Sequence, residues 1–185
     1  MPCKTFYLQM CNPRPELQRA FVQEGVELVE ITPVDARINQ RMYRNVGGPW
    51  GWSDKAEWSL AQWESYVGGV FGEASHIATG VGEASQIATG ESIITMVLYV
   101  DQQEAGYFEL AIVSEPVREV EIRYFGLLPE ALGLGLGAPL LSAAIERGWQ
   151  ESPRRLWVHT CELDHPAALT NYQNRGFELY KTTLE

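Results

Sequence analysis

The sequence Glu119-Val-Glu-Ile-Arg-Tyr-Phe-Gly-Leu-Leu128 is followed by Pro129-Glu130 and then by Ala131-Leu-Gly-Leu-Gly-Leu-Gly-Ala138. In its first part, Val120, Ile122 and Tyr124 alternate with charged residues, which is the period of a strand with two different faces. Residues 139–150 then carry apolar side chains at helical spacing, and their leading proline is tolerated in the first turn of a helix. The stretch therefore predicts a strand, a glycine-rich turn and a helix.

The glycine-rich turn has the properties of a phosphate site. Glycine lets backbone N–H groups approach a ligand, and the first turn of a helix leaves N–H donors unpaired with a partial positive charge. Such a turn suits a phosphate group. We therefore expect a phosphate-bearing cofactor to bind the main-chain amides between Leu132 and Leu140.

Composition and length indicate one folded domain over residues 1–185, with 45% hydrophobic and 21% charged residues. The formal net charge of -10 argues against a nucleic-acid partner, since phosphate backbones need a basic surface. No segment approaches the about 20 apolar residues of a membrane span, and no secretion signal is present, so we expect a soluble, cytoplasmic protein. Cys3, Cys11 and Cys161 lack disulfide or zinc-site spacing and are predicted to be reduced thiols, with no metal bound.

The remaining chain predicts antiparallel strands first and βαβ-like units later, and hence a mixed α/β fold with a mixed sheet. Strands are expected over residues 5–10 and 26–31, as a hairpin-like pair, over 95–100 and 106–113, as a second hairpin, and over 156–160 and 177–182. Helices are expected over residues 34–46, from a cap at Ser53 or Asp54 to 67, and from a cap at Asp164 to 176. Gly72-Glu-Ala-Ser-His-Ile-Ala-Thr-Gly80 recurs as Gly82-Glu-Ala-Ser-Gln-Ile-Ala-Thr-Gly90, which indicates a duplicated loop insert at about 70–92.

Two segments resemble the GNAT superfamily of acetyl-coenzyme A dependent N-acetyltransferases. Leu132-Gly-Leu-Gly-Leu-Gly137 is similar to the family's pyrophosphate loop, and His165-Pro-Ala-Ala-Leu-Thr-Asn-Tyr-Gln-Asn-Arg-Gly-Phe177 resembles the pattern that closes its fold. The resemblance implies a central, splayed mixed sheet of six to seven strands flanked by helices. It also implies acetyl transfer from acetyl-CoA directly to a primary amine of a small molecule or protein.

The resemblance also implies which residues bind the cofactor. Leu132 and Leu134 stand where the family carries polar side chains, so backbone donors would do more of the binding, and His165 stands in place of an asparagine. The implied cofactor-binding residues are Gly126, Leu127, Leu128, Leu132, Gly133, Leu134, Gly135, Leu136, Gly137, Ala138, His165 and Tyr172.

Two catalytic roles are predicted for the transfer. The amine must lose a proton, and Glu121, which lies eleven residues before Leu132 on the strand leading into the loop, is the predicted base, directly or through water. Glu119 is the second choice, and the alternative for Glu121 is a solvent-facing carboxylate paired with Arg123. Tyr172 is the predicted acid for the thiolate, because a phenol with a pKa of about 10 can protonate it. The resemblance implies that backbone N–H groups near residues 126–128 polarise the carbonyl.

The aromatic residues of the early helices divide into two groups. Trp58 and Trp63 fit helical spacing and are predicted to pack in the core, whereas Trp50 and Trp52 lie in a turn and are expected to face the substrate. His159 and Cys161 share one strand face, and a buried histidine and an inert thiol are expected there, because direct transfer needs no covalent intermediate.

Two alternatives remain for the function. One is a catalytically silent acyl-CoA binding module, in which Glu121 and Tyr172 are structural. The other is a dinucleotide-binding oxidoreductase, which ranks lower because the glycines are evenly spaced rather than Gly-x-Gly-x-x-Gly and the expected acidic ribose ligand is missing. Edge strands would permit a homodimer.

Overall fold

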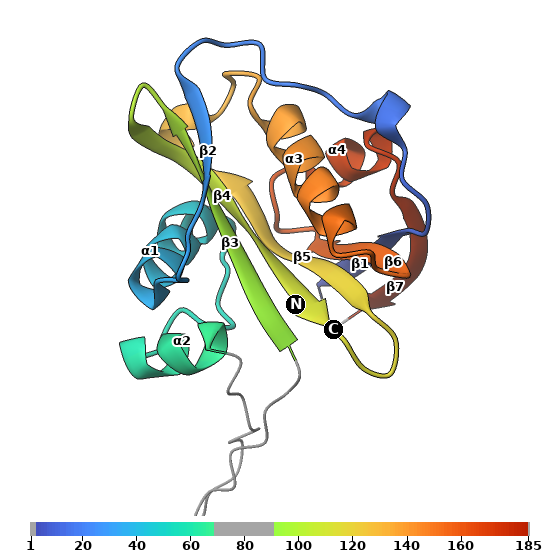
Figure 1. Cartoon of the computed structure of the whole chain (residues 1–185), viewed down its shortest axis with the longest axis horizontal. Helices are drawn as coiled ribbons and strands as arrows, with labels where there is room; N and C mark the ends of the chain where they lie inside the picture. Colours follow the sequence, from blue (N-terminus) through green and yellow to red (C-terminus); the bar gives the residue numbers. More distant parts are fainter. Residues whose placement is uncertain (1–2, 69–90, 185) are drawn as a thin grey trace, which may run out of the picture.

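The computed structural model describes residues 3–68 and 91–184, which form a sheet of seven strands in the order β2-β3-β4-β5-β6-β1-β7 (Figure 1). The strands are β1 (Lys4–Met10), β2 (Val26–Glu30), β3 (Glu91–Val100), β4 (Gln103–Val113), β5 (Glu119–Leu127), β6 (Arg155–Cys161) and β7 (Glu178–Leu184). The helices are α1 (Ala36–Gly47), α2 (Leu60–Val67), α3 (Gly137–Gln150) and α4 (Ala168–Asn174), with short 3-10 turns at Pro15–Leu17, Gly48–Trp50 and Pro129–Ala131. The predicted mixed α/β fold is thus confirmed, while nearly all of the duplicated insert lies outside the described residues.

The sheet is mixed, and the first two strands lie in different halves of it. β2 pairs with β3, whereas β1 lies between β6 and β7 and runs antiparallel to both. The predicted hairpin of residues 5–10 and 26–31 is therefore wrong. Local patterns cannot reveal this arrangement, because the partners of β1 come from the far end of the chain. Among the described strands only β5 and β6 are parallel neighbours, which does not fit a doubly wound dinucleotide-binding sheet.

The helices begin where local capping is available. Asp35 accepts a hydrogen bond from the backbone N–H of Arg37 at the start of α1. Ser59 and Gln62 form a reciprocal capping box at the start of α2, which satisfies two N–H groups that the helix leaves unpaired. The predicted start of this helix after Ser53 or Asp54 is wrong, because the segment before Ser59 forms turns instead. None of the described helices is long and apolar enough to cross a membrane.

Two separate cores pack on the two faces of the sheet. On one face, α3 and α4 cover a mostly aliphatic cluster, here called the aliphatic core, which includes Leu8, Leu110 and Leu140. On the other face, α1 and α2 cover an aromatic cluster that includes Tyr43 and Trp63. The predicted packing of Trp63 and Trp58 is confirmed, since Trp63 is fully buried and the partly buried Trp58 packs against the same cluster.

A β-bulge in β5 changes the faces that its sequence predicts. The register with β4 shifts so that Glu109 faces Tyr124 while Leu110 faces Ile122, which leaves Arg123 as the extra residue. Such an extra residue reverses the alternation beyond it. Ile122 therefore lies in the aliphatic core, whereas Tyr124 lies in the aromatic one, so the predicted common face of Val120, Ile122 and Tyr124 is wrong at its last member.

We predict that Gly106→Ala separates β4 from β5 and lowers the free energy of unfolding by about 1–3 kcal/mol, the usual cost of overpacking. A methyl group at Gly106 would lie 2.6 Å from the backbone oxygen of Gly126 on the paired strand. Urea unfolding measures the change. Gly137→Ala is the matched control, because a methyl group there would come no closer than 3.9 Å to a Leu127 side-chain carbon, an ordinary contact, and equal midpoints for the two variants would contradict the prediction.

Candidate active site

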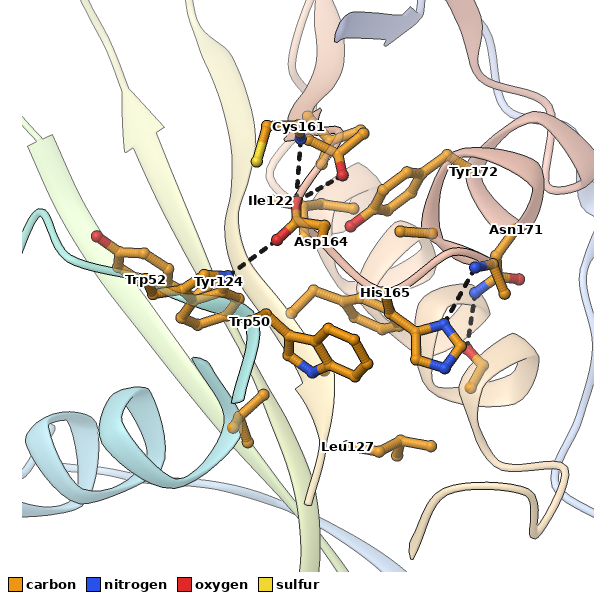
Figure 2. Close-up of a pocket in the computed structure, with 18 of the residues that line it drawn as sticks. Trp50, Trp52, Ile122, Tyr124, Leu127, Cys161, Asp164, His165, Asn171 and Tyr172 are labelled. Carbon is orange, nitrogen blue, oxygen red and sulfur yellow. Dashed lines mark hydrogen bonds between the residues drawn. The ribbon is translucent and has the colours of Figure 1, made fainter. Parts of the chain in front are cut away.

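A large cavity lies where β5 and β6 separate. Their parallel pairing runs from Glu119 with Arg155 to Ile122 with Val158 and then stops. Beyond that point the strands line a cavity of about 1010 Å³, together with the glycine loop, α4 and the turn that carries Trp50 (Figure 2). Most of the predicted site residues, which come from distant parts of the sequence, therefore meet in one cavity.

The glycine loop forms one end of this cavity and leaves its amides free. Gly133 and Gly135 have φ values of 77° and 76°, a left-handed conformation that glycine adopts at little cost. Among the described residues, no acceptor pairs with the N–H groups of residues 133–138, and the next hydrogen bond is that of Leu140 to Leu136. The N-terminus of α3 adds a partial positive charge. The loop thus offers a row of donors to an anion.

The side-chain amides of Gln23 and Asn171, which the sequence did not predict as site residues, bind the loop backbone. Gln23 donates from Nε2 to the carbonyl of Leu134 at 2.7 Å, and Asn171 donates from Nδ2 to the carbonyl of Gly137 at 3.2 Å. Both contacts use carbonyls and leave the N–H groups available. Asn171 belongs to the closing sequence pattern, but the placement of Gln23 beside the loop had no sequence signal. Leu134 itself is 54% exposed and does not line the cavity.

The backbone of β5 offers fewer free N–H donors to a ligand than were predicted for residues 126–128. The N–H of Leu128 bonds the carbonyl of Ala105 at 2.8 Å, so it is not available to a ligand, and Leu128 does not line the cavity. N–H groups alternate in direction along an antiparallel strand. That of Gly126 therefore also points to β4, whereas that of Leu127 points to the side from which β6 has departed.

Glu121 lies in a buried charge cluster at the opposite end of the cavity. Its side chain is 5% exposed, with Oε2 at 2.8 Å from Nε and Nη2 of Arg123, and Oε1 at 3.3 Å from Nδ1 of His159. Arg123 also bonds Glu91. Burial alone would raise the pKa of Glu121, but His159 and Arg123 outweigh it and hold this pKa below its usual range. Glu121 therefore stays ionised. The pairing with Arg123 that the alternative role predicted is present, but the carboxylate is buried and not solvent-facing.

His159 is not the buried histidine that the sequence predicted. Its side chain is 44% exposed and lines the cavity, because the helices do not cover this face of β6. The interaction with Glu121 raises the pKa of His159 above its ordinary value. Burial raises the pKa of the neighbouring Cys161 thiol, which agrees with the inert thiol that was expected.

Tyr172 projects from α4 into the middle of the cavity (Figure 2). The residue is 5% exposed, and its hydroxyl has no hydrogen-bond partner in the described part of the chain. Burial, followed by the charge of Asp164, raises the pKa of Tyr172 above its usual value. The phenol therefore remains protonated across the neutral range and has a proton to donate.

The sequence profile of the Acetyltransferase (GNAT) family matches residues 40–177. The chain belongs to this family. No curated protein sequence matches it.

Solved structures share the fold at low sequence identity. A tandem GNAT protein from the clavulanic acid biosynthesis pathway is 17% identical, with a TM-score of 0.64, and the match covers 100% of this chain and 52% of that one. An aminoglycoside acetyltransferase from an uncultured soil metagenomic sample, in complex with sisomicin, is 8% identical over 84% and 90% of the two chains, with a TM-score of 0.58. The ribosomal-protein-S18-alanine N-acetyltransferase of Escherichia coli is 15% identical over 84% and 79%, with a TM-score of 0.55. The chain thus spans about half the length of the tandem protein.

Asp164 joins three segments of this GNAT domain and is not a helix cap. Its Oδ2 accepts hydrogen bonds from the Thr160 hydroxyl at 2.6 Å and the Cys161 N–H at 3.1 Å, and its Oδ1 accepts one from Trp52 Nε1 at 3.1 Å (Figure 2). The predicted capping role is wrong because α4 begins only at Ala168. Asp164 instead fixes the end of β6 to the tryptophan turn across the cavity.

Aromatic rings form the wall opposite α4. Trp50 and Trp52 both line the cavity, as expected for residues facing a substrate. The Trp50 ring contacts the His165 ring edge-to-face at 4.9 Å, and Nδ1 of His165 accepts a hydrogen bond from the N–H of Ala167. His165 thus lines the cavity, and its Nε2 takes no part in the bond to Ala167.

A second charge group, which the sequence did not predict, lines the cavity beside Trp52. Asp54 accepts hydrogen bonds from the hydroxyls of Tyr43 and Tyr124, and Lys55 lies 2.9 Å from Asp54 and 2.6 Å from the Tyr124 oxygen. Burial raises the pKa of Asp54, but the two tyrosines and Lys55 lower it further than burial raises it. The bulge at Arg123 turns Tyr124 toward this group, which is why alternation along β5 did not reveal it.

We predict that Asp164→Asn lowers the free energy of unfolding by about 1–3 kcal/mol, because an amide N–H₂ would face a donor where the carboxylate now accepts. Urea unfolding followed by tryptophan fluorescence measures the change and also reports on Trp52. Glu162→Gln, an exposed neutralisation two residues earlier, is the matched control. An equal effect of the two changes would show that only charge, and not the three-way contact, matters.

Proposed function

We propose that this GNAT domain transfers acetyl from acetyl-CoA directly to a primary amine. The observation that carries the proposal is the row of N–H groups at residues 133–138, which have no acceptor within the described residues and lie at the gap between β5 and β6. An anionic diphosphate satisfies such donors, whereas leaving them unpaired in a partly enclosed site is unfavourable.

The residues of the cavity fit acetyl-CoA in two ways. The left-handed glycines bring the loop backbone to the cavity without a Cβ in the way. The space beside Gly133 is open, because a methyl group there would meet nothing within 4 Å. The separated strands then provide a continuous groove from the loop to Glu121. When bound, acetyl-CoA would supply an activated acyl group as a thioester. Residues 132–133 and 135–138, Leu127, His165 and Asn171 would hold it.

Three groups of the chain support the transfer step. Glu121 keeps a negative charge at the acceptor end and favours removal of a proton from the amine. The N–H of Leu127 faces the gap and can stabilise negative charge on the carbonyl oxygen. Tyr172 holds a proton on its hydroxyl and can deliver it to the leaving thiolate.

The acceptor is proposed to be a primary amine on a small molecule or on a protein. Trp50 and Trp52 line the cavity together with the carboxylates of Asp54 and Asp164, and aromatic rings with carboxylates suit an ammonium group. Two structures of the same fold, by their names, act on an aminoglycoside and on the alanine of a ribosomal protein, so the fold accommodates both classes. A homodimer through the edge strands β2 and β7 stays a prediction.

One observation favours a second candidate, a silent acyl-CoA binding module. Both oxygens of Glu121 are engaged by Arg123 or His159, which is also expected of a structural ion pair. Incubation with acetyl-CoA and a panel of amines, with free thiol followed over time, distinguishes the two. Thiol release with at least one amine supports the enzyme, whereas coenzyme A binding without turnover supports the module.

We predict that Gly133→Ala weakens coenzyme A binding about tenfold in titration calorimetry. Alanine pays roughly 1–2 kcal/mol in the left-handed region, and every 1.4 kcal/mol is about a factor of ten in affinity. The loop would leave this conformation and misalign its donors. Asn45→Ala, an exposed change in α1 outside the cavity lining, is expected to bind normally. Normal binding by Gly133→Ala would remove the loop from the site.

We predict that Tyr172→Phe lowers turnover by about 10²-fold, the lower range for a general acid, while coenzyme A affinity and stability change little. The hydroxyl has no described partner, so its loss leaves no unpaired group behind. Tyr180→Phe, on the exposed strand β7, is the control. Unchanged turnover and an unchanged pH profile in Tyr172→Phe would contradict the acid role.

A further inference from the structure

We propose that His159 accepts the proton of the amine, and that Glu121 is a positioning residue that acts through it. The proposal rests on the proposed acetyl transfer and names a further group in the same site. Three observations carry it: the enclosure of Glu121, the exposure of His159, and the orientation of the imidazole ring between its neighbours.

The first observation is that Glu121 has no oxygen open to an amine. Oε2 is held by two nitrogens of Arg123, each at 2.8 Å, and Oε1 faces His159. The side chain is 5% exposed, so a substrate nitrogen that reached Oε1 would have to displace the imidazole. Arg123 is in turn fixed by Glu91, which prevents it from swinging aside to open Oε2.

The second observation is that His159 stands between Glu121 and the open cavity. Its side chain is 44% exposed and lines the same cavity as Tyr172. Nδ1 faces the carboxylate at 3.3 Å. Nε2, on the other edge of the ring, has no hydrogen-bond partner among residues 3–68 and 91–184. A carboxylate at Nδ1 favours the tautomer with its proton there, which leaves a lone pair on Nε2.

The third observation is that aromatic neighbours set the plane of the ring. Tyr7 of β1 stacks with His159 at 5.8 Å between ring centroids, and Trp157 of β6 does so at 6.1 Å, both at 30°. Besides Glu121, the acidic groups whose charges act on the imidazole are Asp164, after β6, and Asp54, before α2. The cation that shares the Glu121 carboxylate is Arg123, which binds its other oxygen. The ring is therefore held by stacking, and the net effect of the carboxylates stabilises an imidazolium.

The proton balance of the step is simple. As the amine nitrogen bonds to the acetyl carbon, an N–H bond of the amine breaks and an Nε2–H bond forms. His159 becomes an imidazolium whose charge Glu121 offsets at Nδ1, and it loses this proton to water at its exposed edge. Tyr172 independently protonates the thiolate. No oxidant, reductant or metal is required.

Turnover by His159→Asn, compared with Cys161→Ala, tests the role directly. Asparagine keeps a polar atom near Glu121 but has no titrating nitrogen, so kcat/KM is expected to fall at least about 100-fold, the lower range for a general base. Cys161→Ala, two residues along the same strand face, is expected to keep its rate. An unchanged rate in His159→Asn, with an active wild type, overturns the proposal and leaves the acetyltransferase function intact.

The pH profile separates His159 from Glu121 as the group that titrates. Below the pKa of His159 the imidazole is protonated and cannot accept, so kcat/KM falls as pH falls through that raised pKa. Glu121→Gln removes the cause of the raised pKa, and the acidic limb should move to lower pH while remaining visible. In His159→Asn the limb should vanish. If instead it vanishes only in Glu121→Gln, the carboxylate is the direct acceptor and the proposal is wrong.

A measurement without cofactor separates the pairing from the reaction. Imidazole NMR titration, with the His159 signal assigned by its loss in His159→Asn, should give a pKa above 6.5, the ordinary histidine value, and a lower one in Glu121→Gln. Equal values in the two proteins would overturn the positioning role of Glu121. A wild type that releases no thiol with any amine would overturn the proposed function and the catalytic role together, whatever the titration gives.

Discussion

The parallel ladder of β5 and β6 joins residues 119–122 to 155–158 and then ends, and the site depends on this separation. Each strand keeps an antiparallel neighbour on its other side, β4 or β1, so the sheet stays continuous while one gap opens within it. Backbone groups that face the gap lose their ladder partners and need others. Asp164 supplies one at Cys161 and joins the departing strand to the turn of Trp52. The rest of the gap stays open as a cavity between two cores that are already filled.

Electrostatics differ at the two ends of that cavity. At the glycine loop the positive potential comes from backbone dipoles, since Leu132 and Leu134 contribute no charge. At the acceptor end, Glu91, Arg123, Glu121 and His159 form a chain of alternating sign. Removing ions from water is costly unless each is paired, and this alternation pairs every member except at the exposed edge of His159. The chain therefore ends in a titratable group at the cavity, and a proton can be taken up there without leaving a buried charge unpaired.

Local patterns predicted those parts of the fold that local forces decide. The strand, glycine turn and helix of residues 119–150 follow from alternation, left-handed glycines and a proline in the first turn, and the family resemblance supplied the splayed sheet. The predictions failed where distant segments decide. Strand β1 obtains its partners from residues 155–184, and the bulge at Arg123 depends on β4. His159 is exposed because none of the described helices covers β6 on that side. Burial of a strand residue is a property of the assembled sheet, which alternation alone does not contain.

The bulge connects these features and explains why the acceptor end contains two charge groups rather than one. Without the extra residue at Arg123, Tyr124 would continue on the face of Ile122 and enter the aliphatic core, where its hydroxyl would lack a partner. With it, Tyr124 turns to the side of α1 and donates to Asp54, while Arg123 reaches both Glu91 and Glu121. One inserted residue therefore orients two successive side chains of β5 toward the acceptor side. Arg123 directly follows Ile122, the last residue of β5 that pairs with β6. The change of face along β5 and the opening of the sheet therefore occur at the same place.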